Sequence, residues 1–147
     1  ARGTADLCVA PMKERRRFEA LPEFRYHLRS FLRFSEDAAR QQGVTALQYQ
    51  LMLHTQGFEG REWASVTELA ERLQAQLHGV VALVSRCEDL GLVQRKPSQT
   101  DRRSVEVHLT PKGRRTLARL AIQHADQLSE LAEAVRKASL IEDIQDA

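Results

Sequence analysis

The segment from Ser65 to Asp89 constrains the fold of this 147-residue chain more than any other. Ser65 and Glu68 have the spacing of a capping box, in which the serine hydroxyl accepts the third backbone amide and the glutamate reaches back to the cap amide. After a short join, the apolar residues recur at i, i+3, i+4 and i+7, which is the period of an amphipathic helix. These apolar residues are Val80, Leu83, Val84 and Cys87. The pattern predicts two short helices with a tight turn between them.

A basic hairpin is predicted directly after these helices. Residues 92–96 favour a short strand, residues 97–101 are rich in turn formers, and residues 105–109 alternate apolar and polar side chains. Basic residues are concentrated in and after this hairpin, at Arg95, Lys96, Arg102, Arg103, Lys112, Arg114 and Arg115. An α-helix fits the major groove of DNA, and a thin basic hairpin can lie along the backbone or enter the minor groove. Double-stranded DNA is therefore the predicted partner.

The flanking segments are predicted to be helical. Residues 23–42 show a helical apolar period that Gly43 ends, and Thr110 followed by Pro111 is a strong start for a long last helix. Residues 1–22 are charged and without a pattern, so we interpret them as a leader. The predicted fold is mainly α with a small β-hairpin: one domain over 23–147, with a winged helix-turn-helix lobe at 45–110 between the helical segments 23–42 and 111–147.

Other function classes find no support in the sequence. No apolar run approaches the length of a membrane span and the first residues lack a secretory signal, so we expect a cytoplasmic protein without a membrane partner. Cys8 and Cys87 are far apart, and the five histidines show no metal-binding spacing. We predict no enzyme activity, cofactor or metal site, although metal sensing by residues that folding brings together stays open.

Several short motifs, taken in order, resemble the MarR (multiple antibiotic resistance regulator) family. They are Leu47–Leu53, Ser65–Leu73, Leu83–Arg86, Leu90–Arg95, Asp101–Arg103 and Leu109–Arg114. The resemblance implies a symmetric homodimer, built mainly from the first and last helices, that binds a pseudo-palindromic operator. It also implies that the helix at 76–90 enters the major groove, that Arg103 enters the minor groove and that Asp101 holds the wing tip. The usual activity of the family is repression, relieved in many members by aromatic or phenolic acids, metals or oxidants.

The predicted DNA-binding residues lie on the two helices and the wing. They are Ser65, Thr67, Gln76, His78, Val81, Ala82, Ser85, Arg86, Arg95, Lys96, Asp101, Arg102 and Arg103. Gln76 is a poor helix cap, and the outward positions offer few hydrogen-bonding groups. We therefore expect thin direct readout, with Gln76 and His78 at base edges and Val81 or Ala82 against thymine methyl groups.

A small-molecule effector site is predicted from placement in the family alone. Its candidate residues are His27, Phe31, Tyr49, His54 and Trp63. Cys87 is expected to be a packed, inert thiol rather than a redox sensor. Two alternatives to a specific regulator stay open: a winged-helix module that binds a protein, and an architectural protein that binds DNA without specificity.

Overall fold

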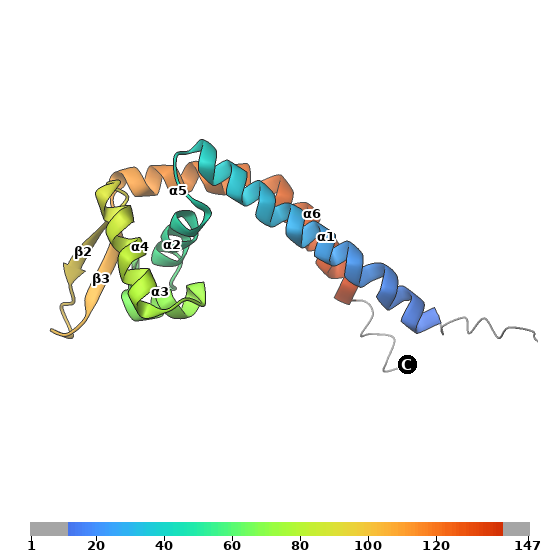
Figure 1. Ribbon diagram of the computed structural model, residues 1–147, viewed down its shortest axis with the longest axis horizontal. Coiled ribbons are helices and arrows are strands. Elements are labelled where there is room, and N and C mark those ends of the chain that lie inside the picture. Colours follow the sequence, from blue (N-terminus) through green and yellow to red (C-terminus); the bar gives the residue numbers. More distant parts are fainter. Residues whose placement is uncertain (1–11, 140–147) are drawn as a thin grey trace, which may run out of the picture. The chain divides into compact units, whose positions relative to one another are not determined.

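The computed structural model describes residues 12–139 and is mainly α-helical, with one small antiparallel sheet (Figure 1). Its elements in chain order are α1 (Met12–Gln41), α2 (Ala46–Gln56), β1 (Trp63–Ser65), α3 (Val66–Leu73), α4 (Leu77–Asp89), β2 (Val93–Pro97), β3 (Val105–Leu109), α5 (Pro111–Gln123) and α6 (Ala125–Ser139). Residues 35–124 form one compact unit, and the described residues on either side of them form a second. The winged helix-turn-helix order predicted from the sequence is confirmed.

The unit at 35–124 has a core of aliphatic side chains contributed by its helices and sheet. Its largest fully buried residues include Leu51, Met52, Leu69, Leu92, Leu120, Val80, Val84, Val93 and Val107. α2, which packs in this core, begins at a capping box formed by Thr45 and Gln48. The Thr45 hydroxyl accepts the amide of Gln48 at 3.1 Å, and the Gln48 side chain accepts the amide of Thr45 at 2.9 Å. Gly43, with φ of 80°, ends α1 as predicted.

The helix-turn-helix forms by the local chemistry predicted for it. Ser65 and Glu68 make both capping-box bonds, each 3.1 Å long. The turn after α3 passes through Gln74, whose φ of 52° puts it in the left-handed region and lets its amide bond the last carbonyls of α3. α4 then buries the four apolar residues of its predicted periodic face, Val80, Leu83, Val84 and Cys87.

The sheet holds three strands in the order β1-β3-β2, where the sequence predicted a hairpin alone. β2 and β3 pair with Arg95 opposite Val107, and β1 pairs on the other edge with Trp63 opposite His108. The three residues of β1 are too few to show a strand period, and pairing with β3 is what makes them a strand.

A close backbone contact joins the end of α4 to the start of α5. The Thr110 hydroxyl accepts the amide of Gly113 at 3.0 Å, and the Thr110 amide donates to the carbonyl of Leu92, also at 3.0 Å. A Cβ atom on Gly113 would lie 2.1 Å from the Leu92 carbonyl oxygen, so only glycine fits this position. Lys112 donates to the carbonyl of Leu90 at 2.8 Å and so caps the end of α4.

Two predicted boundaries of the flanking helices were wrong. α1 begins at Met12 rather than at residue 23 and continues through Pro22, whereas residues 1–11 of the predicted leader lie outside the described residues. Charged residues such as Arg15 and Arg16 are good helix formers even without an apolar period. The predicted long last helix is two helices, because α5 ends at the C-cap residue His124 and α6 begins at Ala125.

The second unit consists of α6 and the part of α1 that precedes residue 35. A groove of about 860 Å³ lies between them, lined by Arg16, Glu19, Ala20, Glu23, His27, Ser129, Glu130, Glu133, Ala134 and Lys137. These two helices also expose many large apolar side chains: Phe18, Leu21, Tyr26, Leu32, Leu128 and Val135. Exposed apolar surface on this scale is typical of a protein–protein contact face.

Candidate nucleic-acid interface

The solvent-facing side of α4 carries the side chains that were predicted to read bases. Gln76 is at the N-cap position with extended backbone and makes no capping bond with its side chain, as expected for a poor cap. His78, Val81, Ala82 and Arg86 are exposed. The opposite side of the helix is buried in the core. α4 is therefore held by one face and leaves the other free to contact a partner.

The two predicted residues at the start of α3, the N-cap residue Ser65 and Thr67, differ in their freedom to bind. Thr67 is exposed on the first turn of the helix. Ser65 is partly buried, and its hydroxyl accepts the amide of Glu68 in the capping box. Its hydroxyl hydrogen is not used by that bond and could be donated to a phosphate.

The wing tip is a turn built by side-chain bonds to its own backbone. One carboxylate oxygen of Asp101 accepts the amide of Arg103 at 3.0 Å, and the Ser98 hydroxyl accepts the amide of Asp101 at 3.2 Å. The amide of Ser104 donates to the Asp101 carbonyl at 3.1 Å. These bonds define the conformation of the tip. Asp101 thus has the geometry expected of a residue that holds the tip.

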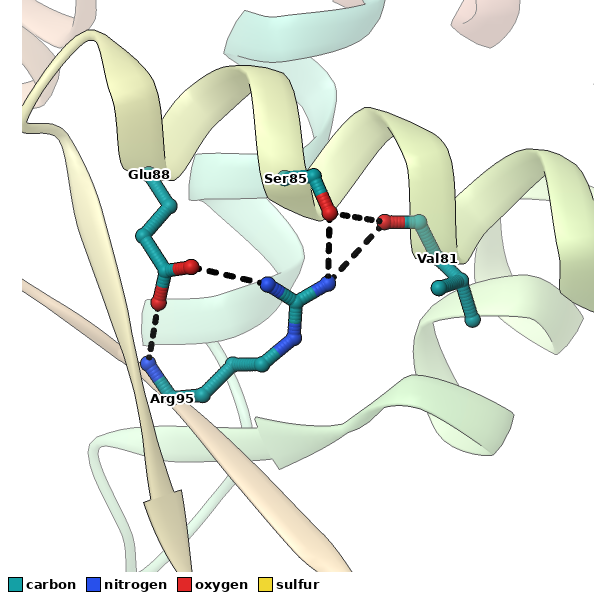
Figure 2. Close-up of polar contacts among 4 residues, drawn as sticks. All are labelled: Val81, Ser85, Glu88 and Arg95. Atoms are coloured by element: carbon teal, nitrogen blue, oxygen red, sulfur yellow. Dashed lines mark hydrogen bonds and ion pairs between the residues drawn. The ribbon is translucent and has the colours of Figure 1, made fainter.

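The cations of the wing differ in what they bond. Lys96, Arg102 and Arg103 are exposed, and among the residues that the structure describes none of their side chains has a hydrogen-bond or ion-pair partner. Their charges are therefore uncompensated at short range, which suits contact with phosphates. Arg95 instead points back onto α4, where it bonds Val81, Ser85 and Glu88 (Figure 2).

Comparison with known proteins agrees with this architecture. A model of the MarR family matches residues 42–104, which include α2, the helix-turn-helix, β2 and the wing tip. This segment of the chain is a MarR family domain. The family predicted from the sequence motifs is confirmed.

A curated relative from Thauera aromatica, described as a putative transcriptional regulatory protein for the hcr operon, is 31% identical over 112 residues. The match covers 71% of this chain and 66% of that relative, a little under two thirds of its length. Solved structures share the fold at lower identity. A mutant of MarR from E. coli complexed with operator DNA has a TM-score of 0.65 at 20% identity, covering 87% of this chain and 94% of that one.

Bordetella bronchiseptica BpsR is a second structural neighbour of the MarR family domain, with a TM-score of 0.61 at 19% identity. The alignment covers 84% of this chain and 90% of that one. The description of that structure concerns regulation of DNA binding by 6-hydroxynicotinic acid.

The predicted effector residues of the MarR family domain have separate surroundings. Tyr49 is buried and stacks on His124, with ring centroids 5.2 Å apart, and burial raises its pKa. His54 is half-buried, and desolvation together with the charge of Arg72 lowers its pKa. The ring of Trp63 lies under the Arg61 guanidinium at 4.3 Å. Among the described contacts, none joins Tyr49, His54 and Trp63 to one another.

The sequence did not predict a cluster of arginines and aromatic rings that includes Trp63. Arg61 lies 4.3 Å from the centroid of Phe58 and makes an ion pair of 2.8 Å with Glu68, while Arg72 lies 5.0 Å from Phe58. The loop before β1 carries no regular period, so no sequence signal pointed to Phe58 or Arg61. The cluster offers cations beside ring faces, the chemistry that recognises an aromatic anion.

His27 and Phe31 belong to α1 in the other unit. His27 lines the groove between α1 and α6 and bonds Glu23 at 3.1 Å. The prediction that all five side chains line one effector site stays a prediction.

Cys87 lies fully buried in α4, and desolvation raises the pKa of its thiol to about 11. A thiol in this state is a poor nucleophile. Cys8 lies outside the described residues. No group of three or more metal-binding side chains occurs within residues 12–139, and none of the helices described there has the length and apolarity to cross a membrane.

Proposed function

We propose that this chain is a homodimeric transcription regulator that binds double-stranded DNA with sequence specificity, through α4 in the major groove and the wing in the minor groove. The observation that carries the proposal is the pairing of an exposed α4 face with a bonded wing tip on which the side chains of Arg102 and Arg103 have no partner within the described residues. Guanidinium groups are favoured in a narrow minor groove because negative potential concentrates there. The E. coli relative bound to operator DNA supports the same use of the fold.

The wing assignment is tested by replacing Arg103. Arg103→Ala should weaken binding to DNA from upstream of the protein's own gene by about 1–3 kcal/mol, the range for a base-reading arginine. Arg119→Ala is the matched control, because Arg119 is an exposed arginine on α5 and the charge change is the same. The measurement is fluorescence anisotropy in matched salt. Equal DNA affinities of Arg103→Ala and wild type would show that the assignment of the wing to the DNA interface is wrong.

The exposed apolar residues of α1 and α6 are the basis for proposing a homodimer. Six exposed large apolar side chains lie on the described parts of these helices outside the 35–124 unit. Burying such side chains against a second copy would stabilise the dimer by the hydrophobic effect. Sedimentation should give a dimer for wild type at micromolar concentration. Phe18→Glu combined with Leu128→Glu should give a monomer, and a monomeric wild type would contradict the proposal.

We also propose that the protein is a repressor released by a small aromatic or phenolic acid. The effect of 6-hydroxynicotinic acid on the relative BpsR supports the effector class, and the arginine–aromatic cluster around Phe58 has suitable chemistry. Isothermal titration with 6-hydroxynicotinic acid should show binding that His54→Ala and Tyr49→Phe weaken. Unchanged affinity in both variants would count against these residues. Failure of every phenolic acid to release DNA would count against the effector class.

A further inference from the structure

The guanidinium of Arg95 crosses from β2 to α4 and bonds that helix at three places (Figure 2). Its Nη1 donates to a Glu88 carboxylate oxygen at 2.8 Å. Its Nη2 donates to the Ser85 hydroxyl at 2.9 Å and to the backbone carbonyl of Val81 at 3.0 Å. The backbone amide of Arg95 donates to the second Glu88 oxygen at 3.0 Å. Both the side chain and the main chain of one strand residue are thus fixed to the helix.

The three bonded residues of α4 follow the spacing i, i+4 and i+7 and share one face of the helix. They span about 10 Å along its axis at 1.5 Å per residue. Because a guanidinium is a planar, rigid fork of donors, bonds over that span restrict both rotation of α4 about its axis and sliding along it. Arg95 is itself fixed in the sheet opposite Val107, which is fully buried. The side chain and the main chain of Arg95 therefore both link β2 of the wing to α4.

These bonds already use three of the five N–H donors of the Arg95 guanidinium. Its side chain is 28% exposed, and both terminal nitrogens are already bonded to α4. Turning the side chain toward DNA would break the bonds to Val81 and Ser85 and leave the Glu88 carboxylate without its guanidinium partner on a surface that faces a polyanion. The neighbouring Lys96 is exposed and has no such bonds within the described chain.

We propose that Arg95 is a positioning residue: it sets the orientation of α4 relative to the wing for specific DNA recognition and makes no phosphate contact of its own. The inference rests on the proposed DNA-binding function and revises the sequence prediction that Arg95 contacts DNA. Misorienting α4 weakens base contacts but leaves attraction to the phosphates in place. Loss of Arg95 should therefore reduce discrimination between DNA sequences and leave the salt dependence of binding unchanged.

The test compares Arg95→Met with Lys96→Met, two adjacent substitutions that each remove one positive charge and keep an unbranched side chain. Kd is measured by anisotropy over a potassium chloride series, for a duplex from upstream of the gene and for its scrambled version. Arg95→Met should lower the ratio of specific to non-specific affinity by about tenfold, with the wild-type salt slope. Lys96→Met should keep that ratio and reduce the slope by about one, as expected for a lost phosphate contact. A slope reduced by Arg95→Met, with the ratio kept, would overturn the inference.

Glu88→Gln gives a second test that does not depend on the folding of Arg95→Met. Removing a negative charge near DNA should by itself tighten binding to both duplexes. The positioning role predicts a lower specificity ratio instead, and little further loss when Arg95→Met is added. Tighter binding with the ratio unchanged would overturn the role. If the wild-type protein binds both duplexes equally, the proposed function is wrong as well. If the wild type prefers the specific duplex and the Arg95→Met and Glu88→Gln variants prefer it to the same degree, only the positioning role of Arg95 is wrong.

Discussion

Replacing Gly113 with alanine tests the contact between the start of α5 and Leu92, the residue before β2. The new Cβ would lie 2.1 Å from the carbonyl oxygen and 3.1 Å from the carbonyl carbon of Leu92, both backbone atoms. A normal contact to that oxygen needs about 1 Å more, and overpacking of this kind costs about 1–3 kcal/mol. Moving the carbonyl also strains its bond to the Thr110 amide, worth about 1 kcal/mol. The gain in helix propensity from alanine, about 1 kcal/mol, offsets part of this.

We therefore expect Gly113→Ala to lower the free energy of unfolding by about 2 kcal/mol, or Tm by about 6 °C for a chain of this size. Gly79→Ala is the matched control: Gly79 lies inside α4 with no atom within 4 Å of the position a Cβ would take. It should raise the free energy of unfolding by about 0.8–1 kcal/mol. Urea unfolding followed by circular dichroism, at equal protomer concentrations, measures both. A Gly113→Ala protein as stable as wild type would show that the Leu92 backbone does not restrict position 113 to glycine.

Three further predictions follow from local chemistry. Because burial raises the Cys87 pKa to about 11, its thiol should react with iodoacetamide at least about a hundredfold more slowly in the folded than in the urea-unfolded protein; equal rates by peptide mapping would contradict this. The folded-state pKa of His54 lies below its unfolded value, so the unfolded state binds more protons and stability should fall as pH drops below about 6.5. Denaturant titrations of His54→Gln should show a flatter pH dependence there, and an unchanged slope would argue against the assignment. Ser65→Ala removes the α3 cap and should cost about 1 kcal/mol of unfolding free energy in the same assay, so a loss near zero would disprove the role of the cap.

The sequence predicted the helix-turn-helix well because its signals are local. The capping bonds of Ser65 and the buried period of α4 depend on residues within one or two helical turns. The third strand was missed because residues 63–65 gain their structure from β3, which lies more than forty residues further along the chain. The break at His124 was missed because no glycine or proline marks it.

In the candidate site too, features set by neighbouring residues could be predicted from the sequence, and contacts between elements could not. The exposure of His78 and Arg103 and the turn made by Asp101 follow from local patterns. The bonds of Arg95 do not, because Val81 and Glu88 lie on another element and the strand period gives only the face on which a side chain lies. A basic residue in a wing is therefore predictable from sequence, but whether it bonds the protein or DNA depends on tertiary geometry.

Whether α4 and the wing read a specific DNA sequence is decided by the ratio of specific to non-specific affinity of the unmodified protein. Its Kd is measured for the duplex from upstream of its own gene and for the scrambled duplex, at about 150 mM salt, since affinities have meaning only at a stated salt concentration. We expect at least about a thousandfold preference for the native duplex. Equal weak binding to both duplexes would indicate an architectural DNA-binding protein, and no binding to either would indicate a module that binds another protein. Each of these results would contradict specific DNA recognition by α4 and the wing.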